Sequence, residues 1–390
     1  MHYPMDEHPL SPNLGGASGG GDFPSINYLE WYEPRLQQGV THDLSQSGLQ
    51  YPWDWESLVE GKMLDGYSDL ISKIEFDPRT FVADREQVDY SQVVGGHGVS
   101  QCLLFALLAV MNDNKPRKVA VEVPSYAPVS QFARALGCEV IPFTRGPANS
   151  SDCGPWKICR SELEGIIDNV CAVVTTPLQN PTGWMMDADD QQWLANICRK
   201  AGIGLVSDEV YLDSTKGTEY YRPMHRFGPH CVSVNSLTKC YGLGNLRVGW
   251  IIGTKEIAVN AFRAMHNLQG SLAMPSLHLA KLAWPHLDTP LEYIKQRRAE
   301  NLPLLQEVLS NNGIEWSPPP TGIFGCFPLP EGIDSQWFVE EICSKYDLLV
   351  IPGLMFSPEL SNLVRVAWGS ELSQFSAAME AFNHCLQELK

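Results

Sequence analysis

The feature that most constrains the fold is a regular alternation of strand-like and helical stretches between Gln92 and about Gly253. The strand-like runs are short and rich in Val, Ile and other apolar residues; they lie at 118–123, 139–142, 172–175, 203–207, 231–234 and 247–252. This alternation is typical of βαβ units, which build a mostly parallel sheet covered by helices on both faces. Because ligands bind such sheets beyond the carboxyl ends of the strands, the residues that follow these runs are the first candidates for a functional site.

The rest of the chain predicts a second, smaller unit. With 390 residues and 44% apolar content, the chain is long enough for a large core and an additional domain. A long polar helix is expected at about 291–311, and residues 315–371 have the pattern of a smaller α/β unit. At the start of the chain, residues 9–24 are rich in Pro, Gly and Ser, which is typical of a flexible tail, and residues 28–36 predict a short aromatic helix.

Charge and cysteine content argue against several classes of partner. A formal net charge of −17 and a pI near 5.0 argue against a nucleic-acid or anionic-membrane surface. No apolar run is long enough to span a bilayer, and the first residues lack the basic and apolar regions of a signal peptide. The 11 cysteines form no CxxC pairs, so we expect reduced thiols in a cytoplasmic protein and no metal site.

A single lysine stands in a turn of small residues in the run 236–250, SLTKCYGLGNLRVGW. This lysine is Lys239, and Arg247 follows it by eight positions. An isolated S-x-x-K is more often a surface lysine, and a lone arginine is often structural. A lysine held in a buried turn can instead offer its amine to an aldehyde, and a planar guanidinium suits a phosphate. The pair therefore indicates a ligand that carries both an aldehyde and a phosphate.

Polar side chains follow two of the strand-like runs. The run 172–175 leads into a turn with Asn180, although Asn-Pro turns are common. The run 203–207 ends at Asp208, and Tyr211 follows three residues later; an Asp at a strand end is equally often a helix cap. Because both positions follow strands of the predicted sheet, we expect Asn180 and Asp208 at its carboxyl edge.

A glycine-rich turn, Gly95-Gly96-His97-Gly98, precedes the apolar helical stretch 103–111. Such a turn presents free backbone N–H groups and the positive end of a helix dipole to an anion. Glycine-rich loops are frequent, so this turn indicates an anion site only together with the other three features.

In this order, the four features resemble the fold-type I pyridoxal-phosphate enzymes of the class I/II aminotransferase family, from about residue 40 onward. The resemblance implies an α/β protein of aminotransferase fold type I, with a mostly parallel sheet in the large domain and a smaller α/β domain. It implies pyridoxal 5'-phosphate as the cofactor, an α-amino acid as the small-molecule substrate and a homodimer. It divides the chain into a tail at 1–25, a large cofactor-binding domain at 55–285, and a small domain from 26–54 plus 286–390.

The resemblance also assigns catalytic roles. Lys239 matches the Schiff-base lysine, Asp208 the partner of the pyridine nitrogen, and Tyr211 and Asn180 the groups that hydrogen-bond the ring 3'-oxygen. The cofactor ring withdraws electrons from the substrate Cα, and a nearby carboxylate keeps its nitrogen protonated. The released amine of Lys239 then serves as the general base.

The binding roles follow in the same way. The phosphate cradle matches Ser236, Arg247, Ser100 and the backbone of Val99. Tyr126 matches the aromatic residue that stacks on the pyridine ring. Arg365, with Asn180, matches the group that grips the substrate α-carboxylate, where its role is orientation.

Two segments depart from the usual family pattern. Family members usually carry a tyrosine before a G-x-x-x-L-x-x-x-I helix, and it reaches the cofactor phosphate of the neighbouring subunit. Here the helix motif lies at 66–74 and Gly61 takes the approximate place of the tyrosine, which leaves that contact unassigned. The head of the chain, with Leu29-Glu30-Trp31-Tyr32 and the later 43–49, is similar to capreomycidine synthase-like enzymes, which eliminate and cyclise. In the glycine-rich turn, His97 either contacts the ligand or packs within the turn.

Three activities stay open at this point. The resemblance favours an aminotransferase that acts through an external aldimine and a quinonoid. The same residues serve elimination, replacement or cyclisation in secondary metabolism, because these reactions diverge only after Cα deprotonation. A non-catalytic ligand-sensing domain would need an attached helix-turn-helix, for which the short acidic head leaves no room. The substrate side-chain pocket is expected from 45–55, from residues near Tyr126 and from the partner subunit, whereas Asp54 and Glu56 are expected on the surface.

Overall fold

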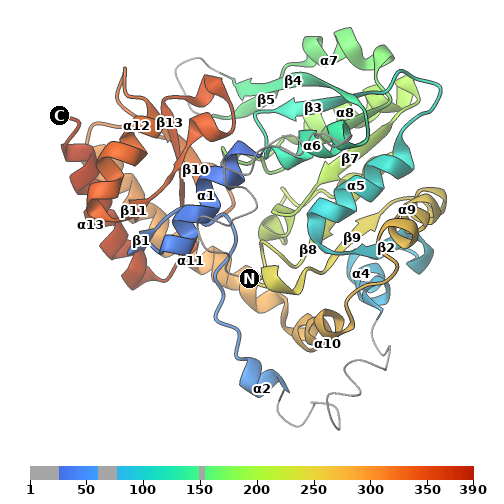
Figure 1. Ribbon diagram of the computed structural model, residues 1–390, viewed down its shortest axis with the longest axis horizontal. Helices are drawn as coiled ribbons and strands as arrows, with labels where there is room; N and C mark the ends of the chain where they lie inside the picture. Colours follow the sequence, from blue (N-terminus) through green and yellow to red (C-terminus); the bar gives the residue numbers. More distant parts are fainter. Residues whose placement is uncertain (1–25, 60–76, 149–153) are drawn as a thin grey trace, which may run out of the picture.

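The computed structural model describes residues 26–59, 77–148 and 154–390. At its centre is an eight-stranded sheet with the strand order β2-β9-β8-β7-β6-β3-β4-β5 (Figure 1). Its strands are β2 (Val93–Gly96), β3 (Lys118–Val123), β4 (Glu139–Pro147), β5 (Trp156–Ile158), β6 (Ala172–Thr175), β7 (Gly204–Asp208), β8 (Cys231–Ser236) and β9 (Gly249–Ile252). Five neighbours, β4, β3, β6, β7 and β8, run parallel, whereas β9 and β5 run antiparallel to their neighbours. The mostly parallel sheet expected from the sequence is confirmed.

The six predicted strand runs coincide with β3, β4, β6, β7, β8 and β9, although β4 continues to Pro147 instead of ending at residue 142. The start of β9 also differs, for an informative reason. β9 begins at Gly249 and not at residue 247, because Arg247 has a φ of 53° and closes a short 3-10 turn, Gly244–Leu246. A left-handed backbone cannot continue a strand. This correction places Arg247 in the turn that follows Lys239, with its side chain free to reach a ligand.

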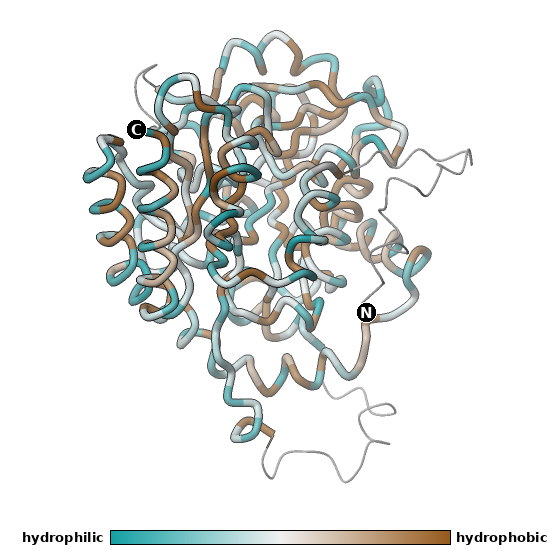
Figure 2. Tube along the Cα trace, turned by 60° about the vertical axis from the view of Figure 1, so that its left-hand side comes forward, coloured by the Kyte–Doolittle hydropathy of each residue, from teal (hydrophilic) through white to brown (hydrophobic). Residues whose placement is uncertain are grey.

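Helices cover both faces of the sheet, as the alternation of side chains along the strands requires. Val173 and Leu205 pack into a core with α7 (Arg160–Ile166) and α8 (Ala188–Ala201). Their neighbours Val174 and Val206 face the opposite way, into the larger core with α5 (Gly98–Val110). The same part of the molecule also contains α2 (Trp55–Val59), α4 (Pro78–Glu86), α6 (Pro128–Ala135), α9 (Lys255–Leu268) and α10 (Met274–Ala283). Figure 2 shows hydrophobic and hydrophilic residues alternating along the helices.

The small domain contains a three-stranded antiparallel sheet. Its order is β10 (Phe324–Pro328), β13 (Leu363–Ala367) and β12 (Ile351–Pro352), and Arg365 on the central strand lies opposite Cys326 and Ile351. The helices α11 (Asp288–Asn311), α12 (Ser335–Trp337) and α13 (Leu372–Gln387) belong to it, with a π-helical turn at Phe338–Ile342. The long helix predicted at about 291–311 is confirmed and begins three residues earlier.

The beginning of the described chain lies against this small domain. A two-residue strand, β1 (His42–Asp43), pairs in parallel with β11 (Leu348–Leu349). Before it, α1 (Asn27–Gln38) lies between the small domain and the large sheet (Figure 1), and it confirms the predicted aromatic helix. Tyr28 and Tyr32 of α1 pack with Leu349, Ile351 and Tyr126.

Some sequence predictions stay untested by this arrangement. The tail at 1–25 and the helix motif at 66–74 lie outside the described residues. The domain boundaries at 54/55 and 285/286 remain predictions. Within the described part of the chain, every helix is too short or too polar to cross a bilayer.

Candidate active site

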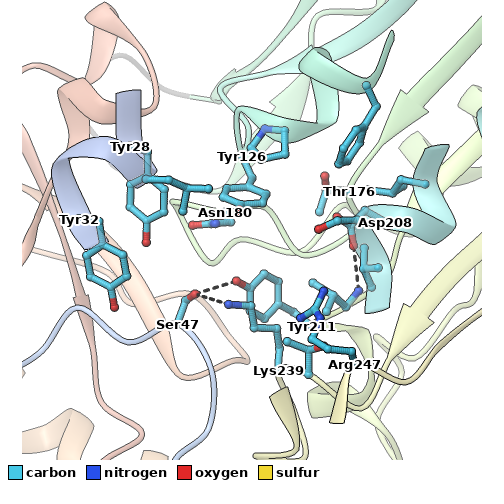
Figure 3. A pocket seen from close by; sticks show the side chains of 18 residues that line it. Tyr28, Tyr32, Ser47, Tyr126, Thr176, Asn180, Asp208, Tyr211, Lys239 and Arg247 are labelled. Atoms are coloured by element: carbon cyan, nitrogen blue, oxygen red, sulfur yellow. Dashed lines mark hydrogen bonds between the residues drawn. The ribbon is translucent and has the colours of Figure 1, made fainter. Parts of the chain in front are cut away.

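A cavity of about 170 Å³ opens at the carboxyl edge of the large sheet, beside α1, which carries Tyr28 and Tyr32 (Figure 3). It is lined by most of the residues that the sequence predicted, namely Val99, Ser100, Tyr126, Asn180, Asp208, Tyr211, Lys239 and Arg247. These residues come from segments that follow β2, β3, β6, β7 and β8. The parallel topology therefore brings together side chains that lie up to 148 positions apart, between Val99 and Arg247.

Lys239 lies in the turn after β8 and points into the cavity (Figure 3). Its backbone carbonyl accepts a hydrogen bond of 2.8 Å from the N–H of Leu49. Burial, together with the positive charge of Arg365, lowers the pKa of the Lys239 amine to about 8. The neutral form of this amine is thus far more populated near neutral pH than that of an ordinary lysine, as a nucleophilic or basic lysine requires.

Asp208 ends β7 and is 5% exposed. Its Oδ1 accepts a hydrogen bond of 3.1 Å from the backbone N–H of Val210. Burial raises the pKa of its carboxyl group to about 6, against the opposing effects of this hydrogen bond and of Lys239. The group is mostly ionised at pH 7, and a cationic partner would hold it so more firmly.

Tyr211 stands beside Lys239 and shares a neighbour with it (Figure 3). Its hydroxyl donates a hydrogen bond of 2.9 Å to Oγ of Ser47, and Nζ of Lys239 lies 3.5 Å from the same oxygen. Burial raises the pKa of Tyr211 well above its ordinary value, so the phenol remains a neutral donor.

The opposite end of the cavity is built for an anion. Gly98, with a φ of 73°, opens α5, and a Cβ at this position would lie only 2.4 Å from Nη2 of Arg247. The helix has no side-chain cap, so the first backbone N–H groups are available, including that of Val99. Ser100 and Thr238 add hydroxyls, and Oγ1 of Thr238 is buried without a hydrogen-bond partner. A buried donor without a partner beside a guanidinium and a helix N-terminus fits a phosphate.

Two predicted residues do not border the cavity. Ser236 is fully buried behind Thr238, where its Oγ accepts a hydrogen bond of 3.2 Å from the Thr238 N–H. Arg365 is also fully buried, behind Asn180, whose Oδ1 accepts 2.7 Å from Nη1. Ser236 therefore contacts the cavity wall through Thr238, and Arg365 through Asn180 and Tyr28.

The surroundings of Arg365 are largely aromatic. Its guanidinium carbon lies 5.2 to 5.8 Å from the ring centres of Tyr28, Phe324 and Phe356. Nη2 donates 2.7 Å to the Ser45 carbonyl, while Nε has no partner. Among the residues that the structure describes, no carboxylate pairs with this arginine, so its charge can receive one from outside.

Several other residues line the cavity that the sequence did not single out; they are Tyr28, Leu29, Tyr32, Leu103, Phe132, Thr176, Val210 and Thr238. The i, i+4 spacing of Tyr28 and Tyr32 and the place of Thr238 next to Lys239 were available signals. Of the head segment 45–55, Ser47 borders the cavity; the contribution of the rest of the segment and of a partner subunit to the substrate pocket stays a prediction. Asp54 and Glu56 are exposed, as predicted.

Two residues near the site have packing roles. Nε2 of His97 accepts a hydrogen bond of 3.1 Å from the backbone N–H of Ala273, and His97 does not line the cavity. The structure therefore supports the packed alternative for this histidine. Cys240 is buried, with its thiol directed at the carbonyl of Val210, so it fills space within the turn.

Comparison with known proteins places the sequence in context. The family model for aminotransferase class I and II matches residues 67–382. Threonine-phosphate decarboxylase of Salmonella typhimurium is 24% identical over 213 residues, a match that spans 52% of this chain and only 56% of that relative. Arginine–pyruvate transaminase AruH of Pseudomonas aeruginosa is 25% identical over 326 residues, 80% of this chain and 79% of the relative. Capreomycidine synthase of Streptomyces vinaceus is 24% identical over 357 residues, 88% of this chain and 90% of the relative.

Solved structures show the same fold. A PLP-dependent aminotransferase from Streptococcus suis superimposes with a TM-score of 0.81 at 20% identity, over 95% of this chain and 99% of that one. The PLP-dependent cyclase OrfR gives 0.79 at 22% identity, over 96% and 100% of the two chains. At this level of identity the likeness establishes the fold alone, which confirms the expected aminotransferase fold type I.

Proposed function

The chain belongs to the class I and II aminotransferase family of pyridoxal-phosphate-dependent transferases, and on this premise we propose that it transfers the α-amino group of an amino acid to a keto acid. The observation that carries the proposal is one cavity that joins the Lys239 amine, the Asp208 carboxylate and an anion site, with an unpaired buried arginine behind it. Each of these four groups would contribute to a different part of the reaction: binding of the cofactor, binding of the substrate, or proton transfer.

The residues present fit pyridoxal 5'-phosphate. The anion end matches the phosphate in both charge and donors: the Arg247 guanidinium, the N-terminus of α5, Ser100, and the unpartnered hydroxyl of Thr238. Ser236 would support Thr238 from behind and not touch the phosphate itself. Tyr126 lines the cavity and offers a ring face for stacking. When bound, the cofactor supplies an aldehyde that combines with an amine and a ring that withdraws electrons from the substrate Cα.

The catalytic work of the chain falls on three groups. Nζ of Lys239, with a pKa near 8, is the base that takes the proton from the substrate Cα. The Asp208 carboxylate, ionised at neutral pH, holds a proton on the ring nitrogen through its negative charge. The neutral phenol of Tyr211 and the amide N–H groups of Asn180 would serve as hydrogen-bond donors to the ring oxygen of the cofactor.

Arg365 would bind the substrate α-carboxylate. Its guanidinium is fully buried, has no carboxylate partner in the described chain, and already shares Asn180 with the cavity. Because an Arg–carboxylate pair is bidentate and directional, it fixes the orientation of the Cα–H bond as well as the affinity. Access requires only that Asn180 and Tyr28 yield part of their contact with the guanidinium.

A second candidate function is elimination, replacement or cyclisation in secondary metabolism. It is favoured by the similarity to capreomycidine synthase and to the cyclase OrfR. The same residues remove the Cα proton in both cases, so they do not discriminate the two reactions. Formation of pyridoxamine phosphate on mixing with amino acids supports transfer, whereas ammonia or a cyclic amine without pyridoxamine phosphate supports the second candidate.

The proposal also includes a cytoplasmic homodimer. No disulfide joins any of the ten cysteines of the described residues, which suits a reducing compartment. Exposed apolar residues on α9, among them Phe262 at 40% and Leu268 at 63% exposure, suit a surface that a second copy covers.

The test is to trap the bond that Lys239 makes. The purified chain is incubated with pyridoxal phosphate, reduced with borohydride and mapped by peptide mass. We expect the added mass on the peptide with Lys239, and its complete absence in Lys239→Ala, together with loss of the absorbance band and of turnover. The matched control Lys200→Ala, at an exposed lysine of α8, should behave as the unmodified chain. Labelling of other lysines with Lys239 untouched would overturn the proposal.

A further inference from the structure

We propose that Ser47 is a positioning residue for Lys239, whose hydroxyl holds the lysine amine between the arginine site and the cofactor site. The inference rests on the proposed function, in which Lys239 is the reactive amine. Ser47 comes from the head of the chain, 192 positions before Lys239, and is 7% exposed on the wall of the cavity.

The last three residues of the segment 44–49, here called the strap, lie along Lys239 from its backbone to its amine. The N–H of Leu49 donates to the Lys239 carbonyl at 2.8 Å. A Cβ at Gly48 would lie 3.4 Å from Cδ of Lys239, so the glycine leaves the side chain just enough room. Oγ of Ser47 lies 3.5 Å from Nζ, the outer limit of a hydrogen bond, which a small rotation of either side chain shortens.

The strap is fixed at its other end to the small domain. The N–H of Leu44 donates 2.9 Å to the carbonyl of Leu349, and the N–H of Ala367 donates 2.8 Å to the carbonyl of Leu44. The Ser45 carbonyl accepts 2.7 Å from Nη2 of Arg365. Ser47 therefore stands on a rigid piece of chain that links the carboxylate-binding arginine to the lysine.

The hydrogen-bond capacity of Ser47 matches this role. Its oxygen already accepts the Tyr211 hydroxyl at 2.9 Å, which leaves one lone pair and its own proton. The free lone pair of Ser47 can accept a hydrogen bond from the protonated amine of Lys239. Its hydroxyl proton can instead be donated to the lone pair of the neutral amine. The hydroxyl can thus hold the amine before and after a proton moves. A lysine side chain is otherwise flexible, and loss of position lowers the rate of a proton transfer.

The experiment compares Ser47→Ala, Ser47→Thr and the strap control Gln46→Ala in the full chain. Gln46 directs its amide to Asp43 and does not line the cavity. One readout is kcat against KM for a reacting amino acid. The other needs no turnover: the rate at which the cofactor-stripped chain captures pyridoxal phosphate is followed by absorbance from pH 6 to 10.

For Ser47→Ala we expect kcat to fall roughly tenfold with KM within about threefold, because a hydrogen bond to the reacting group is lost. The midpoint of capture should move to lower pH by roughly half a unit, because an acceptor that favours the ammonium has gone. Ser47→Thr keeps the hydroxyl and should restore both values, and Gln46→Ala should change neither.

Two results would overturn the inference: no effect of Ser47→Ala, or no rescue by Ser47→Thr. If Ser47→Ala matches Gln46→Ala in kcat and midpoint, Ser47 does not position the amine. If Ser47→Ala and Ser47→Thr lose the same activity, the hydroxyl is not the cause and the residue only packs. A chain without any capture at Lys239, before mutation, would instead refute the proposed function itself.

Discussion

Arg145 and Arg365 are both fully buried, yet the protein surrounds them in opposite ways. Arg145 on β4 forms an ion pair of 3.2 Å with Glu122 and donates to the carbonyls of Thr176 and Trp184. Arg365 on β13 has the Asn180 amide oxygen, the Ser45 carbonyl and the Tyr28 hydroxyl as acceptors, and its Nε has none. One cation is neutralised inside the fold, whereas the other is left without a counter-charge among the described residues.

In the proposed function, this difference separates a structural buried charge, Arg145, from one that receives a substrate carboxylate, Arg365. A buried ion costs several kcal/mol of desolvation unless it is paired. The Arg145 pair also holds the carbonyls around the loop that carries Asn180, so it supports the site from behind. An unpaired guanidinium retained at the same depth makes physical sense if a carboxylate arrives during function.

The largest expected effect comes from breaking the paired arginine. Arg145→Met should lower the free energy of unfolding by about 3–5 kcal/mol, because it leaves the Glu122 carboxylate buried without its partner. Urea unfolding measures this. Adding Glu122→Gln should recover part of the loss. Lys118→Met, which removes an exposed ion pair with Glu139, should cost less than about 1 kcal/mol. If Arg145→Met and Lys118→Met lowered the free energy of unfolding by the same amount, the buried ion pair would not differ from an exposed one.

The second effect concerns the unpaired arginine. Arg365→Met should leave the free energy of unfolding within about 1 kcal/mol, because removing an uncompensated buried charge offsets the lost hydrogen bonds. Substrate binding should weaken by about 2–4 kcal/mol, roughly 30- to 1000-fold, because the carboxylate loses its partner. Inhibition constants of an unreactive carboxylic acid measure this beside the cofactor affinity. Losses of equal size for cofactor and acid would contradict the carboxylate role.

A third effect uses pH to separate the two arginines. Capture of pyridoxal phosphate requires the neutral amine of Lys239, so the rate should rise with pH and level off above about 8, the pKa of that amine. Because the charge of Arg365 lowers this pKa, Arg365→Met should raise the midpoint. Arg145→Met should leave it unchanged. Stopped-flow absorbance at several pH values gives the midpoints, and a downward move in Arg365→Met would refute the assigned coupling.

The smallest expected effect concerns the hydroxyl of Tyr28, which accepts a hydrogen bond from Arg365. Tyr28→Phe removes a hydroxyl 3.4 Å from Nη2 and keeps the ring, so KM should rise no more than about fivefold, equivalent to roughly 1 kcal/mol. Tyr32→Phe is the matched control, since that hydroxyl faces Ser45. Steady-state kinetics distinguish them, and a larger loss in Tyr32→Phe would reverse the order of the two tyrosines.

Much of the fold and of the cofactor half of the site was predictable from local sequence. Val173 and Leu205 lie in runs whose apolar content predicts strands buried on both faces, and Asp208 and Lys239 follow such strands directly. In a parallel sheet the ends of these strands meet at one edge, so their order along the chain is enough to place the side chains together. The backbone at Arg247 was not predictable in this way, because its left-handed φ depends on the turn that packs around it.

The sequence alone therefore determined which functional groups the site can contain and where they stand relative to strands and turns. These groups are a lysine amine, a carboxylate, an arginine and a helix that begins at a glycine. Only the tertiary structure decided the contacts between distant segments, such as Ser47 beside Lys239 and Tyr28 above Arg365. It also decided that Arg145 is paired while Arg365 is not. The reason is physical: strand and turn propensities act over a few residues, whereas burial, pairing and pKa depend on which parts of the chain exclude water together.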